Sequence, residues 1–322
     1  MKIVFHGGNA ANFHAGFEAI LGEGHEILVL PDRIESSADR AAFAAAEVII
    51  GVKLTKDDPF PASVRLYHAP AAGTDAIDRA CLPANAVLCN AFGHEHAIAE
   101  YVMAALLARH VPLARADERL REGHWDFWAG RPGALRTELG SQAIGLLGFG
   151  HIGKAIATRA KAFGMRVSVC NRSQVPIGAL TDEAYGLEAL PAFMASADAI
   201  VVSLPLMEET RGIVGTSAIG AMRSDAVILN VGRGPVIDEA ALYAALADRR
   251  IGGAIIDTWY QYPTPENTQT LPSSFPFHAL PNVVMTPHMS GWTDGTIRRR
   301  QETVAENIRR LGQGLPMFNG LP

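Results

Sequence analysis

Residues 144–173 place the strongest constraint on what this chain can fold into. The apolar residues 144–147 predict a buried strand, and a helical pattern after the next turn leads to a second apolar segment at residues 165–170. The turn carries glycines with G-x-G-x-x-G spacing, namely Gly148, Gly150 and Gly153. This order of elements is typical of a dinucleotide-binding unit, because the glycines let backbone N–H groups approach a pyrophosphate. An ordinary strand-to-helix turn without a ligand is the weaker alternative.

The rest of the chain repeats the alternation of short apolar strands with helical segments. The first series of strand candidates is "KIVF", "EILVL", "EVIIGV", "VRLYHA" and "AVLCN". The second series, which starts at Ala143, is "AIGLLG", "RVSVC", "AIVVSLP", "AVILNVG", "GGAIIDTW" and "NVVMTPH". Such alternation predicts parallel sheets covered by helices, and a chain of 322 residues can form two medium domains. We therefore expect two Rossmann-like, doubly wound α/β domains.

Between the two series lies the longest helical pattern of the sequence. It covers residues 97–123, and its length suits a spine that connects two lobes. Residues 124–141, rich in Trp, Gly and Pro, predict a loop into the second series.

Composition excludes several classes of function. The net charge is −5 and no long run of Lys or Arg occurs, so we expect neither a nucleic-acid nor a membrane partner. The three cysteines lack metal-ligand spacing and form no disulfide framework, which suits a reducing compartment. The first apolar run is too short for a signal peptide. We expect a cytoplasmic protein without a metal site.

Six stretches resemble one family in their order and spacing. They are "APAAGTDAID" (69–78), "AIAEYVMAALL" (97–107), "PLMEETRGIVG" (205–215), "AVILNVGRGPVIDEAALYAAL" (226–246), "GGAIIDTWYQYP" (252–263) and "VVMTPHMSGWT" (283–293). Together they resemble the D-isomer-specific 2-hydroxyacid dehydrogenases over nearly the whole chain. The resemblance implies a nucleotide domain, residues 98–288, inserted into a flavodoxin-like substrate domain made of residues 1–97 and 289–322. It also implies a homodimer that pairs through the nucleotide domain.

The resemblance assigns the catalytic roles. Arg233 matches the arginine that binds the substrate carboxylate and polarises the carbonyl, and His288 matches the acid/base. Asp257 matches an aspartate near the nicotinamide amide. Ala72 and Gly73 match the loop whose backbone N–H groups hold the substrate carboxylate. Further cofactor contacts are implied for Gly148, Gly150, His151, Ile152, Gly153, Asn171, Arg172, Ser173, Pro205, Thr210 and Val231.

The end of the second strand favours NADP(H) over NAD(H). NAD-specific relatives have an Asp at the Asn171 position, where it binds both ribose hydroxyls and repels a 2′-phosphate. Asn171 removes that charge, and Arg172 and Ser173 add a cation and a hydroxyl, which suits a 2′-phosphate. If Arg172 only stacks on adenine, NAD(H) is acceptable too.

One position departs from the family. A Glu normally accepts a hydrogen bond from the catalytic His and raises its pKa, whereas Tyr262 occupies this position here. A phenol is neutral at pH 7, so we expect the pKa of His288 to be about 6.5 or lower, and keto-acid reduction to be fastest in mildly acid solution. Glu266 and Glu95 are the acids that could replace the missing Glu.

The sequence thus predicts an NADPH-preferring reductase of a small 2-keto acid such as glyoxylate or hydroxypyruvate. A formate-type dehydrogenase is the first alternative, because formate dehydrogenases also lack the Glu. A cofactor-sensing protein of the corepressor type is the second. A phosphite dehydrogenase is disfavoured, since Ala72 stands where those enzymes have a Lys.

Several polar and aromatic residues remain open in function. Trp125, Trp128, Arg131, Trp292 and residues 94–96 either shape the substrate pocket or serve packing and dimer contacts. His94 and His96 have the spacing of a metal pair, but a solvated or cleft-lining loop is the better interpretation because no third ligand is evident. For the dimer, we expect contacts from the apolar face of residues 101–107 and from "HWDFW".

Overall fold

The computed structural model describes residues 1–264 and 267–321. The chain divides into two compact units: unit 1 is Met1–His94 with Trp292–Pro322, and unit 2 is Glu95–Gly291. Both divisions lie three residues from the domain boundaries expected from the sequence. The first and last parts of the chain therefore form one unit, and the middle part is inserted between them.

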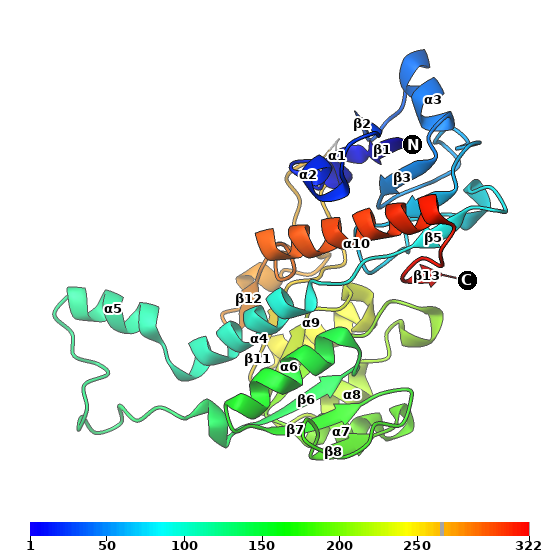
Figure 1. The fold of residues 1–322 in the computed structure, drawn as a ribbon. Helices are drawn as coiled ribbons and strands as arrows, with labels where there is room; N and C mark the ends of the chain where they lie inside the picture. Colours follow the sequence, from blue (N-terminus) through cyan, green and yellow to red (C-terminus); the bar gives the residue numbers. More distant parts are fainter. Residues whose placement is uncertain (265–266, 322) are drawn as a thin grey trace. The chain divides into compact units, whose positions relative to one another are not determined.

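Unit 1 is built on a six-stranded sheet in the order β13-β5-β4-β3-β1-β2 (Figure 1). Its strands are β1 (Lys2–His6), β2 (Glu26–Leu30), β3 (Val48–Gly51), β4 (Leu66–His68), β5 (Val87–Cys89) and β13 (Gly320–Leu321). The first five pair in parallel, in the flavodoxin-like order, and the five expected strands of the first series all form. β13 was not expected, and it pairs antiparallel with β5.

Helices cover both faces of this sheet. They are α1 (Gly7–Ala11), α2 (Phe17–Leu21), α3 (Ser37–Ala44), α10 (Asp294–Gln313) and the 3-10 turn η1 (Arg79–Cys81). α10 is the longest helix in the described residues, so the expectation that the spine would be longest was wrong. Val304 and Ile308 of α10 pack with Phe5 of β1 on one face, and Phe43 of α3 packs on the other.

A buried histidine links the sheet to α10. His68 is fully buried at the end of β4, and its Nδ1–H donates to the Ala69 carbonyl at 3.1 Å. Two bonds between Asn307 and the backbone of Phe318 fix the orientation of the Asn307 amide, so its Nδ2 donates to His68 Nε2 at 3.0 Å. Burial lowers the pKa of His68 to about 4. Protonation of His68 would also place a hydrogen on Nε2, which would then face the N–H donor of Asn307 Nδ2.

His68 should therefore make unit 1 sensitive to acid. The unfolded chain binds a proton near pH 6.5 and the folded one only near pH 4, so stability is complete above pH 6.5 and falls as pH drops toward 4. The loss amounts to about 3 kcal/mol. His68→Gln should flatten this part of the stability–pH curve in thermal melts, whereas His124→Gln, at an exposed position, should leave it unchanged. Equal slopes in wild type and His68→Gln would contradict the prediction.

Unit 2 has a seven-stranded, fully parallel sheet in the order β12-β11-β10-β9-β6-β7-β8. The strands are β6 (Ala143–Leu147), β7 (Arg166–Cys170), β8 (Glu183–Tyr185), β9 (Ala199–Val202), β10 (Val227–Asn230), β11 (Gly253–Ile256) and β12 (Val283–Met285). This is the dinucleotide-binding strand order with one strand added at an edge. All six expected strands of the second series form, and β8 is an addition. The two doubly wound parallel sheets predicted from the sequence are confirmed.

Helices also cover both faces of the second sheet (Figure 1). The α-helices are α4 (Glu95–His110), α5 (Leu113–Arg121), α6 (His151–Ala162), α7 (Leu190–Ala195), α8 (Thr216–Ala221) and α9 (Glu239–Ala247). The 3-10 turns are η2 (Leu139–Ser141), η3 (Leu187–Ala189), η4 (Glu208–Thr210), η5 (Gly234–Val236) and η6 (Phe277–Ala279). α4 and α6 enclose one core layer with the sheet, and α7, α8 and α9 enclose the other.

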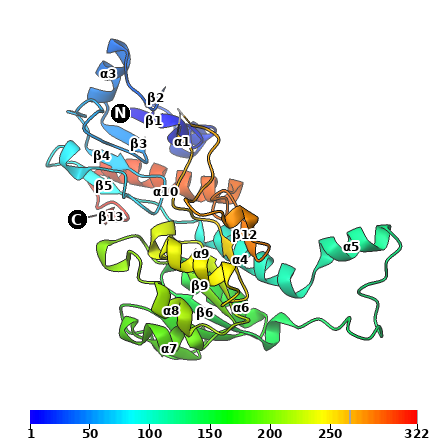
Figure 2. The same cartoon turned by 180° about the vertical axis from the view of Figure 1, so that it is seen from behind.

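The expected spine helix is broken. Residues 97–123 form two helices, α4 and α5, which meet at 46°. Pro112 lies between them, and proline removes a backbone donor and clashes with the preceding turn. In Figures 1 and 2, α5 extends away from the sheet of unit 2. No single described helix has the length and apolar character to cross a membrane, and only the bent pair α4 and α5 meets those two criteria together.

Candidate active site

The glycine turn of unit 2 has the geometry that the sequence predicts. Gly148 follows β6 with a φ of +101°, a left-handed conformation that favours glycine. A Cβ on Gly153 would lie 2.3 Å from the Gly148 carbonyl oxygen, so only glycine lets α6 approach the turn. Gly150, at the N-terminus of α6, offers no side chain to bond the first N–H groups of the helix. A pyrophosphate fits this cradle.

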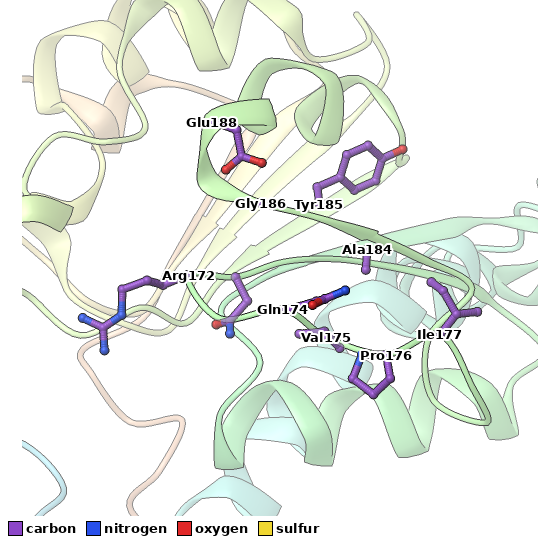
Figure 3. Close-up of a pocket in the computed structure, with 10 residues that line it drawn as sticks. Arg172, Gln174, Val175, Pro176, Ile177, Ala184, Tyr185, Gly186 and Glu188 are labelled. Atoms are coloured by element: carbon purple, nitrogen blue, oxygen red, sulfur yellow. The ribbon is translucent and has the colours of Figure 1, made fainter.

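The end of β7 borders a pocket of about 470 Å³ (Figure 3). Asn171 bridges locally, since its Oδ1 accepts from Phe149 N–H at 3.3 Å and its Nδ2 donates to the Ser173 carbonyl at 3.0 Å. Arg172 extends out at one side of the pocket, and the Glu188 carboxylate lies at another, beside Gly186. The sequence did not identify Glu188 as a pocket residue, because Glu188 follows β8, a strand that was not predicted.

A tight turn after β10 positions Arg233. Asn230 clamps this turn, because its Nδ2 donates to the Arg233 carbonyl and its Oδ1 accepts from Gly232 N–H, both at 3.1 Å. A Cβ on Gly232 would lie 2.6 Å from the Leu204 carbonyl oxygen, and one on Gly234 would lie 2.2 Å from that of Trp259. The flanking glycines therefore let the turn pack closely and leave the half-buried Arg233 at the carboxyl edge of the sheet.

His288 and Tyr262 form a hydrogen-bonded pair. His288 follows β12, and its backbone has a φ of +57°, which is strained for a non-glycine residue. Its Nδ1 lies 2.9 Å from the phenol oxygen of Tyr262. The same phenol oxygen accepts the backbone N–H of Trp259 at 3.0 Å. Tyr262, which was expected at the position of the family Glu without an assigned role, is thus a hydrogen-bond partner of the imidazole.

Asp257 holds the loop that carries His288. It is fully buried, and its Oδ1 accepts from Met289 N–H at 2.9 Å and from the Thr286 hydroxyl at 2.6 Å. Its Oδ2 accepts from Ser290 N–H at 3.0 Å. These bonds fix the backbone on both sides of His288 and support its left-handed conformation. The sequence suggests a cofactor contact for Asp257, but not this anchoring role.

The surroundings of His288 favour its neutral form. Removal of the imidazole from water lowers the pKa of His288, Asp257 acts in the opposite direction, and the positive charge of Arg233 lowers it further. Burial raises the pKa of Tyr262, with the Trp259 N–H acting against it, so the phenol stays neutral. Of the two acids proposed as substitutes, Glu95 is the first residue of α4, and Glu266 lies outside the described residues.

The remaining predicted residues divide between the two units. His151 and Ile152 begin α6, Val231 follows β10, and the Thr210 hydroxyl donates to the Pro205 carbonyl at 2.7 Å in the loop after β9. Ala72 and Gly73 lie in unit 1, in the loop after β4, where Asn90 Nδ2 donates to the Ala72 carbonyl at 2.7 Å. In the described part of the chain, no group of three or more His, Cys, Asp or Glu side chains lies together in a way that could hold a metal.

Two supporting residues are not apparent from the sequence. Trp259 is buried, and its indole N–H donates to the Thr286 carbonyl at 2.8 Å. Tyr101 of α4 shares a 2.8 Å hydrogen bond with the Thr286 hydroxyl. Their contacts join segments far apart in the sequence, and their only sequence signal is their proximity to recognised motifs.

Comparison with known proteins agrees with this arrangement. The model of the "D-isomer specific 2-hydroxyacid dehydrogenase, NAD binding domain" matches residues 103–290. A glyoxylate reductase from Aeropyrum pernix is 33% identical over 78% of this chain and 74% of its own length. The chain belongs to the D-isomer-specific 2-hydroxyacid dehydrogenases. A glyoxylate/hydroxypyruvate reductase B from Citrobacter koseri is 32% identical over 88% of this chain and 86% of its own.

A solved member of this dehydrogenase family shares the whole fold. The family protein from Aeromonas salmonicida subsp. salmonicida covers 99% of this chain and 98% of its own, with a TM-score of 0.81 and 25% identity. Members use a nicotinamide cofactor, which supplies or takes a hydride at the carbon of a 2-keto or 2-hydroxy acid. The glycine turn and the open N-terminus of α6 fit the pyrophosphate of such a cofactor. The oxidoreductase class predicted from the sequence is confirmed.

Proposed function

We propose that this dehydrogenase reduces small 2-keto acids of the glyoxylate or hydroxypyruvate class. The observation that carries the proposal is that the adjacent strands β10, β11 and β12 are followed by Arg233, Tyr262 and His288, so that Arg233 and the Tyr262–His288 pair belong to one edge of the sheet. The Arg233 guanidinium suits the substrate carboxylate, and protonated His288 gives its Nε2 proton to the carbonyl oxygen. The names of the relatives support this substrate class. Ala72 and Gly73 remain predicted contributors of backbone N–H groups.

An absorbance assay tests this proposal directly. Glyoxylate, hydroxypyruvate, larger keto acids and formate are each supplied with NADPH, NADH or the oxidised cofactors, and absorbance is followed at 340 nm. We expect keto-acid reduction. Formate oxidation without keto-acid reduction would favour the formate-type alternative, which the phenol in place of a carboxylate keeps open. Cofactor binding without any turnover would favour a corepressor-type protein.

We also propose that NADP(H) is the preferred cofactor. Arg172 is exposed beside the pocket at the end of β7, and Asn171 brings no negative charge to it. Arg172→Ala should raise the KM for NADPH roughly ten- to a hundredfold more than that for NADH, because one charge-assisted phosphate contact is lost. Arg223→Ala is the matched control, since Arg223 precedes β10 and lies at the opposite edge of the sheet. A wild type that already prefers NADH would refute the preference.

We propose further that unit 2 forms a homodimer through α5 and residues 122–138. Of residues 101–107, which were expected at this contact, Val102, Met103 and Leu106 are buried in their own unit, whereas Ala104 is exposed and Tyr101, Ala105 and Leu107 are half-buried. By contrast Trp125 and Trp128 are each 61% exposed, and Leu135 is also exposed. Light scattering at micromolar concentration should give twice the 34.4 kDa of one chain. Trp128→Glu should shift the mass toward one chain, and a monomeric wild type would refute the dimer.

A further inference from the structure

The hydroxyl of Tyr262 can act toward His288 as a donor or as an acceptor. A backbone N–H only donates, so the bond from Trp259 occupies one acceptor position of the phenol oxygen. A phenol has one O–H and two acceptor positions. One O–H and one acceptor position therefore remain for the imidazole Nδ1, 2.9 Å away.

A carboxylate in this position would act differently. It only accepts, so it would hold the proton on Nδ1 and stabilise the imidazolium. The Tyr262 phenol supports both tautomers of the neutral imidazole instead. When Tyr262 donates to Nδ1, Nε2 carries the proton, and when Tyr262 accepts from Nδ1, Nε2 presents its lone pair. Neutral His288 can therefore offer a substrate either a donor or an acceptor.

The charged groups around His288 do not restore the missing carboxylate. Asp257 is the described acid that acts on the imidazole, but its two oxygens already accept three hydrogen bonds from the surrounding loop. The positive charge of Arg233 opposes the effect of Asp257 and lowers the pKa of His288. Tyr101, the remaining titratable group on a packed helix, bonds to Thr286. The site thus suits a substrate that needs little acid catalysis.

We propose that this site also reduces 2-imino acids, the protonated C=N compounds that a 2-keto acid forms with ammonia or a primary amine. The inference rests on the proposed function, because the same Arg233 would hold the same carboxylate. Reduction of a C=O bond needs a proton from His288, whereas a protonated imine arrives with its own. Neutral His288 would accept the substrate N–H at Nε2, and a neutral imidazole tolerates the adjacent positive charge that an imidazolium would repel.

The reaction balances without a proton from the protein. The imine carbon gains a hydride from the reduced nicotinamide, and the electron pair of the C=N bond becomes the nitrogen lone pair. The protons already on nitrogen stay there. The products are the oxidised nicotinamide and a 2-amino acid. When the imine was formed from a primary amine, the nitrogen of this 2-amino acid carries the alkyl group of that amine.

The test compares glyoxylate alone with glyoxylate plus methylamine, using the full-length protein. Cofactor oxidation is followed at about pH 6 and pH 9, and the products are identified by mass spectrometry. At pH 9 we expect methylamine to raise the rate at least about tenfold and N-methylglycine to be the main product, since loss of a general acid is worth roughly 10²- to 10⁴-fold. At pH 6 we expect glycolate. Mixtures without protein give the background.

Two outcomes separate this inference from the proposed function. Glyoxylate reduction at pH 9 that methylamine leaves unchanged would overturn the imine activity and leave the keto-acid reductase intact. Failure to reduce glyoxylate at either pH would count against the proposed function itself.

Variants at position 262 test the proposal through the reaction product and through NMR of the imidazole, which does not depend on turnover. Tyr262→Glu should shift the product at pH 9 from N-methylglycine toward glycolate, because the carboxylate favours the imidazolium. Nitrogen NMR of the imidazole should show neutral His288 with both tautomers populated in wild type, and a fixed Nδ1–H with a higher pKa in Tyr262→Glu. Tyr262→Phe is the control without a hydroxyl, and His288→Asn assigns the signals. Imidazolium in wild type at about pH 8 would overturn the proposal.

Discussion

Replacing His288 by asparagine is expected to slow the reduction of glyoxylate roughly 10²- to 10⁴-fold. Asparagine keeps a polar side chain in the strained loop, where φ is +57°, but it has no acidic proton to give the carbonyl oxygen. The measurement is kcat/KM for glyoxylate at about pH 6. His278→Asn is the matched control, since His278 is exposed in η6 of the same unit. A variant that keeps more than about a tenth of the wild-type rate would show that His288 is not the proton donor.

The same residue sets the expected pH dependence. Reduction of a keto acid needs protonated His288, and the pKa of His288 is lowered by its surroundings, so the rate should fall as pH rises through a value below about 6.5. Tyr262→Glu should move this fall to higher pH, because the carboxylate stabilises the imidazolium. A wild-type profile that stays flat well above pH 8 would contradict this account of Tyr262.

Asp257→Ala is expected to cause the largest loss of stability. The change leaves the N–H groups of Met289 and Ser290 and the hydroxyl of Thr286 without their acceptor in a buried place. Each unsatisfied group costs about 1–3 kcal/mol, so we expect a loss of roughly 3–5 kcal/mol in unit 2. Thermal unfolding followed by tryptophan fluorescence measures the loss, and amide hydrogen exchange at Met289 and Ser290 should accelerate.

The control for this change is Asp248→Ala, at an exposed position after α9. It should leave both the melting temperature and the exchange of Met289 and Ser290 unchanged. A loss of less than about 1 kcal/mol in Asp257→Ala would mean that backbone packing alone holds the loop. Asp257 would then be free to serve only the cofactor contact that the family resemblance implies.

The sequence alone determined the two parallel sheets, the dinucleotide-binding turn and the family. These features depend on local patterns, since strand and helix periodicity and the spacing of Gly148, Gly150 and Gly153 are all set within a few residues. Arg233 and His288 were predicted from the family resemblance, and each lies three residues after the end of an apolar strand. Parallel strands end at the same edge of a sheet, so such residues are brought together by topology alone.

Only the tertiary structure decided which hydrogen bonds form at this edge of the sheet and where some of the elements begin and end. The break at Pro112 was visible in the sequence but was outweighed by the helical periodicity around it, and β13 exists only because residues 320–321 pair with β5. The bond from Tyr262 to His288 and the anchoring of the His288 loop by Asp257 also join segments far apart in the sequence, and the short-range bond from Trp259 to Tyr262 depends on how the loop between them folds. Such contacts depend on where the folded chain returns in space, and no spacing along the sequence encodes a hydrogen-bond direction. They decide whether the imidazole faces a charge or a neutral hydroxyl, and therefore which chemistry it supports.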